Sequence, residues 1–137
     1  MAWAIFDSSI YIGHWERGLY DDVLLRIRRS FVVRHSAVVL SELRRGARTK
    51  EVQDRVAMLF RLARIQWAPS EQDWSEAGGL IRGIGDREGW DPTKRRSFQN
   101  DALIALTARR YGATIVTANK DDFRLLSTEV GVPTIEA

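Results

Sequence analysis

The chain contains no cysteine and only two histidines, His14 and His35, among its 137 residues. A disulfide framework and a thiolate zinc site are therefore excluded, and a histidine-rich transition-metal site is not expected. No segment approaches the roughly 20 apolar residues that a membrane span requires. The apolar run within Met1 to Ile12 is interrupted by Asp7 and lacks a basic leader, which fits a first strand better than a signal peptide. We expect a cytoplasmic protein with no membrane segment.

The composition is that of a globular protein, with 45% hydrophobic and 28% charged residues, and the length suits a single domain over residues 1–137. The net charge of +3 is modest, so the placement of the basic residues matters more than their number. They gather in three clusters, Arg26/Arg28/Arg29, Arg44/Arg45/Arg48 and Lys94/Arg95/Arg96. These clusters fit either a polyanionic partner or solvated helix faces.

Short apolar, β-branched segments alternate with helical patterns along the whole chain. Strands are expected over residues 2–6, 31–34, 65–69, 113–117 and 133–136. Helices are expected over residues 8–15, 20–29, 37–47, 51–65, from 70 onward, 98–111 and from 122 to about 126. Residues 86–97 form the most polar connection and are expected to be a basic loop. This alternation predicts an α/β fold with a mostly parallel central sheet and right-handed crossovers.

Two acidic residues bracket the segment around which the rest of the chain is organised. Asp101 lies on a helix whose apolar residues cover most of the circumference, so its carboxylate faces inward. Asp122 follows a buried strand that ends at Thr117, and ligands bind at the carboxyl ends of strands in open α/β sheets. An inward carboxylate needs a cation, hydrogen bonds or a raised pKa.

Asp7 and Glu42 extend this pattern to four acids. Asp7 follows the first strand, and Glu42 lies on or beside an apolar helix stripe. Each also has an ordinary interpretation, since Asp7 can cap a helix and Glu42 can pair with Arg45. If the first and fourth strands are neighbours, all four carboxylates converge and require a counter-charge. Oxygen ligands without histidine or cysteine favour Mg²⁺ or Mn²⁺, and the chemistry that fits is phosphodiester hydrolysis.

Four segments carrying these acids occur in an order that resembles a known family. They are Ile5–Ile10 (IFDSSI), Ser36–Ala47 (SAVVLSELRRGA), Asn100–Ala105 (NDALIA) with Ala108, and Thr117–Phe123 (TANKDDF). Each motif is weak alone, but the ordered set resembles PIN-domain ribonucleases, and among these the VapC-type toxins of bacterial toxin–antitoxin pairs. The resemblance implies a three-layer α/β/α sandwich that hydrolyses RNA.

The resemblance also implies a role for each acid. Asp7 and Asp101 would be the main ligands of Mg²⁺ or Mn²⁺, and Glu42 and Asp122 would complete the coordination directly or through water. One of the latter two would help to deprotonate the attacking water. Thr117 and Asn119 would give polar support behind the ligands. The family pattern favours Asp122 over Asp121, whose contribution stays open.

The same resemblance implies a homodimer that is silenced by a cognate antitoxin protein, often through a basic side chain offered to the carboxylates. The stretch 85–97 is longer than is usual in such toxins. Its basic residues Lys94, Arg95 and Arg96, together with Arg44, are candidates for contact with RNA.

Three alternatives differ in chemistry. A receiver domain also gathers acids and Mg²⁺, but no central strand is expected to end in a phosphoacceptor aspartate, and acids on helices have no role there. A haloacid dehalogenase-type phosphatase would need a second aspartate where Ser9 stands. A PIN-like regulatory binding module with little nuclease activity is the third, and the complete set of four acids argues against it.

Overall fold

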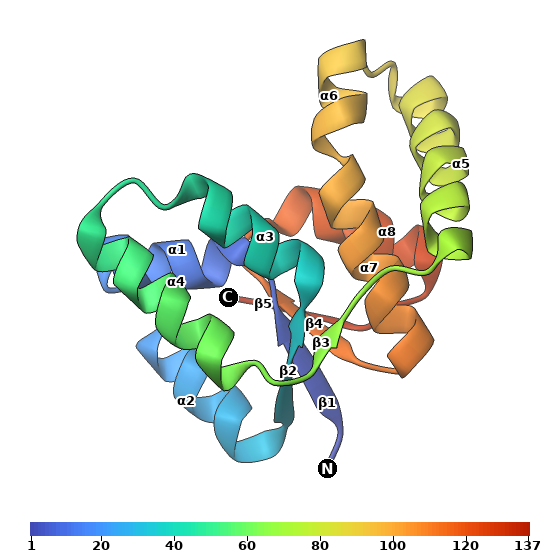
Figure 1. Ribbon diagram of the computed structural model, residues 1–137. Helices are drawn as coiled ribbons and strands as arrows, with labels where there is room; N and C mark the ends of the chain where they lie inside the picture. Colours follow the sequence, from blue (N-terminus) through green and yellow to red (C-terminus); the bar gives the residue numbers. More distant parts are fainter.

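The computed structural model describes residues 1–137 and has one five-stranded parallel sheet at its centre (Figure 1). The strands are β1 (Trp3–Phe6), β2 (Val32–Ser36), β3 (Gln66–Trp67), β4 (Thr114–Thr117) and β5 (Thr134–Glu136). Their order across the sheet is β3-β2-β1-β4-β5, and every pair is parallel. Helices cover both faces, which makes the three-layer α/β/α sandwich that was predicted.

The central strand β1 pairs with β2 on one side and with β4 on the other. The chain moves outward from β1 to β2 and β3, and then crosses back to β4 on the far side of β1. The prediction that the first and fourth strands are neighbours is therefore confirmed. Asp7 directly follows Phe6, the last residue of the central strand β1, as the sequence predicted. Parallel strands bring the ends of β1 and β4 to one edge of the sheet, where the order reverses.

Eight helices connect the strands, and local signals set several of their first residues. They are α1 (Ser8–Arg17), α2 (Asp21–Ser30), α3 (Ala37–Gly46), α4 (Lys50–Leu62), α5 (Glu71–Glu88), α6 (Pro92–Ser97), α7 (Gln99–Tyr111) and α8 (Lys120–Val130). Ser36 caps α3 by accepting a hydrogen bond from the Val39 amide at 3.3 Å. Ser70 and Asp73 form a capping box at the start of α5. None of the helices is long and apolar enough to cross a membrane.

Helix α7 is the centre of the hydrophobic core. Its seven consecutive residues from Ala102 to Ala108 are all buried, which confirms that this helix is enclosed on more than one side. It packs against α3, α5 and α8 and touches β4. Asp101 precedes this buried run by one position, so the core fixes the first turn of α7 beside the sheet edge.

The basic loop predicted for residues 86–97 is the main error in the predicted fold. Helix α5 continues to Glu88, and Pro92 begins the separate helix α6, whose first turn Asp91 caps through the Lys94 amide. Proline is favourable at the first helical position, where its missing N–H is not needed. The last helix also differs, because α8 begins before Asp122 and ends at Val130 rather than near residue 126.

Candidate acidic active site

The carboxyl ends of β1 and β4 open into a pocket of about 630 Å³. All four predicted acids, Asp7, Glu42, Asp101 and Asp122, line this one pocket. Asp7 follows β1, Glu42 comes from α3, and the other two come from the first turns of α7 and α8. The two acids on which the predicted site depends most, Asp7 and Asp101, therefore face the same space.

Asp7 is the most enclosed of the four, with only 3% of its surface exposed. One carboxylate oxygen accepts hydrogen bonds from the Ser9 amide and hydroxyl, and the other accepts one from the Thr117 hydroxyl at 2.7 Å. Asp7 therefore both caps α1 and faces the pocket. All of these donors are neutral. Burial raises the pKa of the Asp7 carboxyl, and the hydrogen bonds only partly offset that effect.

Thr117 and Asn119 connect three of the acids. The Thr117 hydroxyl that donates to Asp7 also accepts a hydrogen bond from the Asn119 amide nitrogen at 2.9 Å. The Asn119 side-chain nitrogen donates to Asp101 and to Asp122, at 3.2 Å each. One short segment after β4 therefore sets the positions of carboxylates that come from β1, α7 and α8.

Asp101 and Glu42 have raised pKa values for two physical reasons. Burial is the larger cause for both carboxyls. For Asp101, repulsion from Asp7, Glu42 and Asp122 adds to burial and brings the pKa to about 8. The Ser8 hydroxyl donates to Glu42 at 3.4 Å, whereas Arg45 acts on Glu42 only as a nearby charge and forms no ion pair with it. The side chains that donate hydrogen bonds to Asp7, Glu42 and Asp101 are neutral, so they do not cancel the negative charge of these carboxylates.

Asp122 alone among the four has a cationic partner. The Lys94 ammonium nitrogen lies 2.8 Å and 3.0 Å from its two carboxylate oxygens. Asp121 has no part in this contact. It is exposed and lines a separate hollow beside Arg87 and Arg124. The structure thus places Asp122, and not Asp121, in the acidic pocket.

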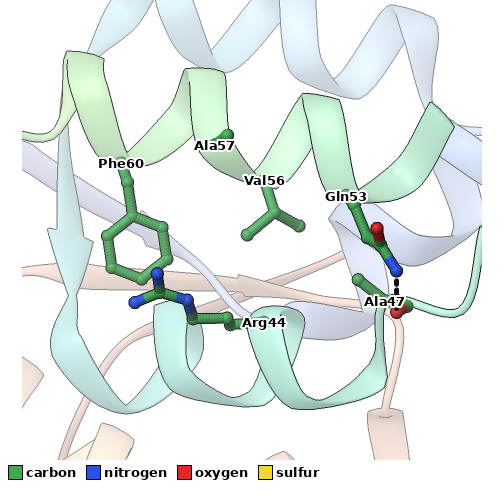
Figure 2. A pocket seen from close by; sticks show the side chains of 6 residues that line it. All are labelled: Arg44, Ala47, Gln53, Val56, Ala57 and Phe60. Atoms are coloured by element: carbon green, nitrogen blue, oxygen red, sulfur yellow. Dashed lines mark hydrogen bonds between the residues drawn. The ribbon is translucent and has the colours of Figure 1, made fainter. Parts of the chain in front are cut away.

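The other basic residues proposed to contact RNA lie outside the pocket. The Arg44 guanidinium lies 5.0 Å from the centre of the Phe60 ring, in a different pocket between α3 and α4 (Figure 2). Arg95 donates to the Trp90 carbonyl and to Asp86. Arg96 is exposed on α6. Their role in RNA binding stays a prediction.

Sequence reasoning did not anticipate the role of Ser9. Its hydroxyl donates to Asp7 and accepts a hydrogen bond from the Ala118 amide at 3.0 Å, so it joins the ends of β1 and β4. The Asp-Ser-Ser sequence indicated a helix cap and a carboxylate at Asp7, but gave no role to the Ser9 hydroxyl.

Tyr20 was also missed. It lines the pocket and is the one non-glycine residue with a positive φ, 69°. Its ring packs so closely on α1 that a Cβ at Gly13 would lie 2.5 Å from it. No local sequence signal marks this contact.

The donor set fits a hard divalent cation. The pocket offers carboxylate oxygens and no sulfur or imidazole ligand, which suits Mg²⁺ or Mn²⁺. Three of the four acids have no ion-pair partner, although every buried polar side-chain atom has a hydrogen bond. No three acidic side chains in the chain converge closely enough to hold an ion by themselves. Such an ion would therefore keep part of its water shell, as Mg²⁺ usually does in proteins.

The parallel order of the sheet and the acids gathered at its switch point define the class of protein. Residues 4–128 match the family described as PIN domain. Since this match spans most of the chain, the protein belongs to the PIN-domain family. No curated protein matches the chain significantly.

Solved structures similar to this chain include VapBC complexes from bacteria. The chain is 20% identical to a chain of VapBC2 from Rickettsia felis bound to a promoter DNA fragment, covering 98% of each chain with a TM-score of 0.68. It is 23% identical to a chain of VapBC-5 from Mycobacterium tuberculosis, covering 100% of each with a TM-score of 0.62. For VapBC-1 from nontypeable Haemophilus influenzae the identity is 17% and the TM-score is 0.68, covering 98% of this chain and 97% of that one. At these identities the likeness establishes the shared fold.

Proposed function

We propose that this protein is a metal-dependent endoribonuclease that hydrolyses RNA phosphodiester bonds in its acidic pocket. The observation that carries the proposal is the pairing of Asp7 and Asp101, two largely buried carboxylates that share one pocket and have no cationic partner. Such a pair is stable in the ionised state only with a counter-ion. Membership of the PIN-domain family supports a nuclease in general.

Each acid has a distinct part in this proposal. Asp7 and Asp101 bind Mg²⁺ or Mn²⁺, and Glu42 and Asp122 complete the coordination directly or through water. The bound ion would lower the pKa of a water molecule and stabilise negative charge on the phosphate. Glu42 is suited to accept the proton of that water, since burial raises the pKa of its carboxyl and makes it a stronger base. Thr117 and Asn119 hold the carboxylates in place through their hydrogen bonds.

The likeness to VapBC complexes supports a biological role as the toxin of a toxin–antitoxin pair. In that role the chain forms a homodimer and is inhibited by a cognate antitoxin encoded beside it. Co-expression of a small upstream reading frame should yield a stable complex and should suppress RNA cleavage. A neighbouring product that neither binds the chain nor inhibits cleavage would contradict this role and leave the nuclease proposal standing.

The test of the nuclease proposal is cleavage of RNA by the purified, partner-free protein with Mg²⁺ or Mn²⁺. Asp7→Asn and Asp101→Asn should each lower the rate by at least about 100-fold, because each removes a ligand charge while keeping the shape of the side chain. Asp121→Asn is the matched control, since Asp121 is an exposed neighbour of the site that faces another hollow. Its rate should equal that of the wild type.

Wild-type rates in the Asp7→Asn and Asp101→Asn variants would show that the site assignment is wrong. A folded wild-type protein that binds the metal and its antitoxin but cleaves no RNA would favour the alternative of a regulatory binding module.

A further inference from the structure

An ammonium group from α6 contacts Asp122, one of the four acids that line the pocket. Lys94 Nζ donates to both carboxylate oxygens of Asp122, and only 18% of the Asp122 side chain is exposed. The two residues are 28 positions apart in the chain, so the contact depends on how α6 is placed against α8. It is the one ion pair that involves any of the four pocket acids.

The position of Lys94 is defined on several sides. Its ammonium lies 5.1 Å from the centre of the Trp90 ring and 5.6 Å from that of Phe98, and those two rings pack against each other at 4.7 Å. A cation near two aromatic rings gains attraction from both. Asp91 caps the first turn of α6 by accepting from the Lys94 amide at 2.8 Å. The lysine is thus held by its helix, by two rings and by a carboxylate.

Helix α6 is itself anchored to α5 by Arg95. The Arg95 side chain donates to the Trp90 carbonyl at 3.0 Å and forms an ion pair with Asp86 at 3.1 Å. Its guanidinium lies against Gly85, where an added Cβ would come within 2.8 Å of it. Because Gly85 has no side chain, Arg95 can occupy this place and set the position of the turn that carries Lys94.

The four acids differ in whether a cation contacts them. Both oxygens of Asp122 accept hydrogen bonds from Lys94, and one also accepts from Asn119. Asp7, Glu42 and Asp101 have only neutral donors. A divalent ion that bound Asp122 directly would have to compete with an ammonium already placed there.

We propose that Lys94 is a resident cation at the edge of the acidic pocket, which keeps Asp122 from binding a metal ion directly and limits the pocket to a single divalent ion bound by Asp7 and Asp101. The proposal refines the role of Asp122 and rests on the proposed function only in that the pocket takes a divalent ion. Lys94 acts as a positioning residue, and its charge takes the place of a second metal ion beside Asp122.

Binding of Mn²⁺ alone, without RNA, tests this inference through electron paramagnetic resonance and calorimetric titration. The wild type should bind one ion per chain. Lys94→Gln should bind Mn²⁺ about tenfold more tightly and take up a second ion, because it frees a carboxylate and removes a positive charge from the pocket. Lys94→Met, which keeps the alkyl chain against the rings, should behave in the same way. Lys50→Gln is the control, since it makes the same change on the exposed face of α4.

A second substitution separates the specific contact from a general change in charge. Asp122→Asn in the Lys94→Gln background should return the protein to one ion and to an affinity close to that of the wild type. Without metal, Lys94→Gln should lower the melting temperature near pH 7, and the added Asp122→Asn should restore it.

The inference is overturned if Lys94→Gln and Lys94→Met bind Mn²⁺ with the number and affinity of the wild type, or if Lys50→Gln tightens binding equally. A chain that binds no Mn²⁺ in any form contradicts both this inference and the proposed function. One Mn²⁺ in the wild type and two in the Lys94 variants, with no cleavage of RNA, would contradict the proposed function alone.

Discussion

At the scale of single residues, Asp101 makes the stability of the metal-free protein depend on pH. Burial and the neighbouring acids raise the pKa of its carboxyl from 3.8 to about 8 in the folded protein. Between these two values the folded chain keeps a proton that the unfolded chain releases. The free energy of unfolding therefore falls as the pH rises toward 8, by at most about 1.4 kcal/mol per pH unit for one proton.

Asp101→Asn should remove this dependence. In the presence of a chelator, denaturant unfolding of the wild type and the variant from pH 5 to 8 should show the variant gaining relative stability as the pH increases. Asp121→Asn, on the exposed neighbour, should follow the wild type. Parallel pH profiles for wild type and Asp101→Asn would mean that Asp101 is ionised throughout this range.

Thr117→Val tests the hydrogen bonds that support Asp7. The substitution keeps the shape of the side chain but removes the donor to Asp7 and the acceptor for the Asn119 amide. We expect a loss of about 1–3 kcal/mol in the free energy of unfolding, because buried polar groups lose their partners. The affinity for Mn²⁺ should fall by about 10-fold or more, as is usual when groups behind metal ligands are removed.

Thr114→Val is the control for Thr117→Val. Thr114 begins the same strand, and its hydroxyl makes no side-chain hydrogen bond. Its Mn²⁺ affinity should not change. Equal effects at the two positions would indicate that the strand, and not the hydroxyl at Thr117, is responsible.

The sequence was sufficient to find the four acids because each follows a strand or lies on or beside a buried helical stripe, and such patterns are local. It did not show the contact of Lys94 with Asp122, since nothing near either residue indicates the other. The same holds for Ser9, whose hydroxyl reaches the Ala118 amide 109 positions away. Residue types and spacing predicted the acids, whereas the groups that hold them depend on tertiary packing.

At the scale of elements, the pair α5 and α6 shows that a polar, basic stretch can be helical where a loop is predicted. Gly83 and Gly85 lie inside α5, where glycine costs about 1 kcal/mol relative to alanine. The loop over residues 86–97 was predicted from the polar and basic character of that stretch. The helix is stable there because α5 packs along α7 and because Arg95 fills the space over Gly85. Tertiary packing of α5 therefore outweighs the low helix propensity of its glycines.

Gly83→Ala and Gly85→Ala should therefore differ. Nothing lies within 4 Å of an added Cβ at Gly83, so the alanine should stabilise the protein by about 0.5–1 kcal/mol through helix propensity. At Gly85 the Cβ would displace the Arg95 guanidinium from Trp90 and Asp86, which should cancel that gain. Urea denaturation of both variants gives the comparison. Equal stabilisation at the two sites would show that Arg95 moves without cost.

At the scale of the whole molecule, a divalent ion should raise the melting temperature by binding only the folded state. The shift caused by Mg²⁺ or Mn²⁺ should be larger at pH 8 than at pH 5.5, because the ion must displace the proton that Asp101 holds below pH 8. Differential scanning fluorimetry with and without metal measures this shift in melting temperature at each pH. Asp101→Asn should lose most of the shift, and an equal shift in that variant would place the ion elsewhere.

The crossover that returns the chain from β3 to β4 has a consequence for synthesis on the ribosome. The hydrogen bond between Thr117 and Asp7 spans 110 positions, and α8, which carries Asp122, follows β4. Nascent chains that still lack these last segments have three acids and no finished cavity. A protein that cuts RNA would then acquire this ability only once nearly the whole polypeptide has emerged from the ribosome. This order would delay damage to the message being translated and would give an inhibitor time to bind before the site is complete.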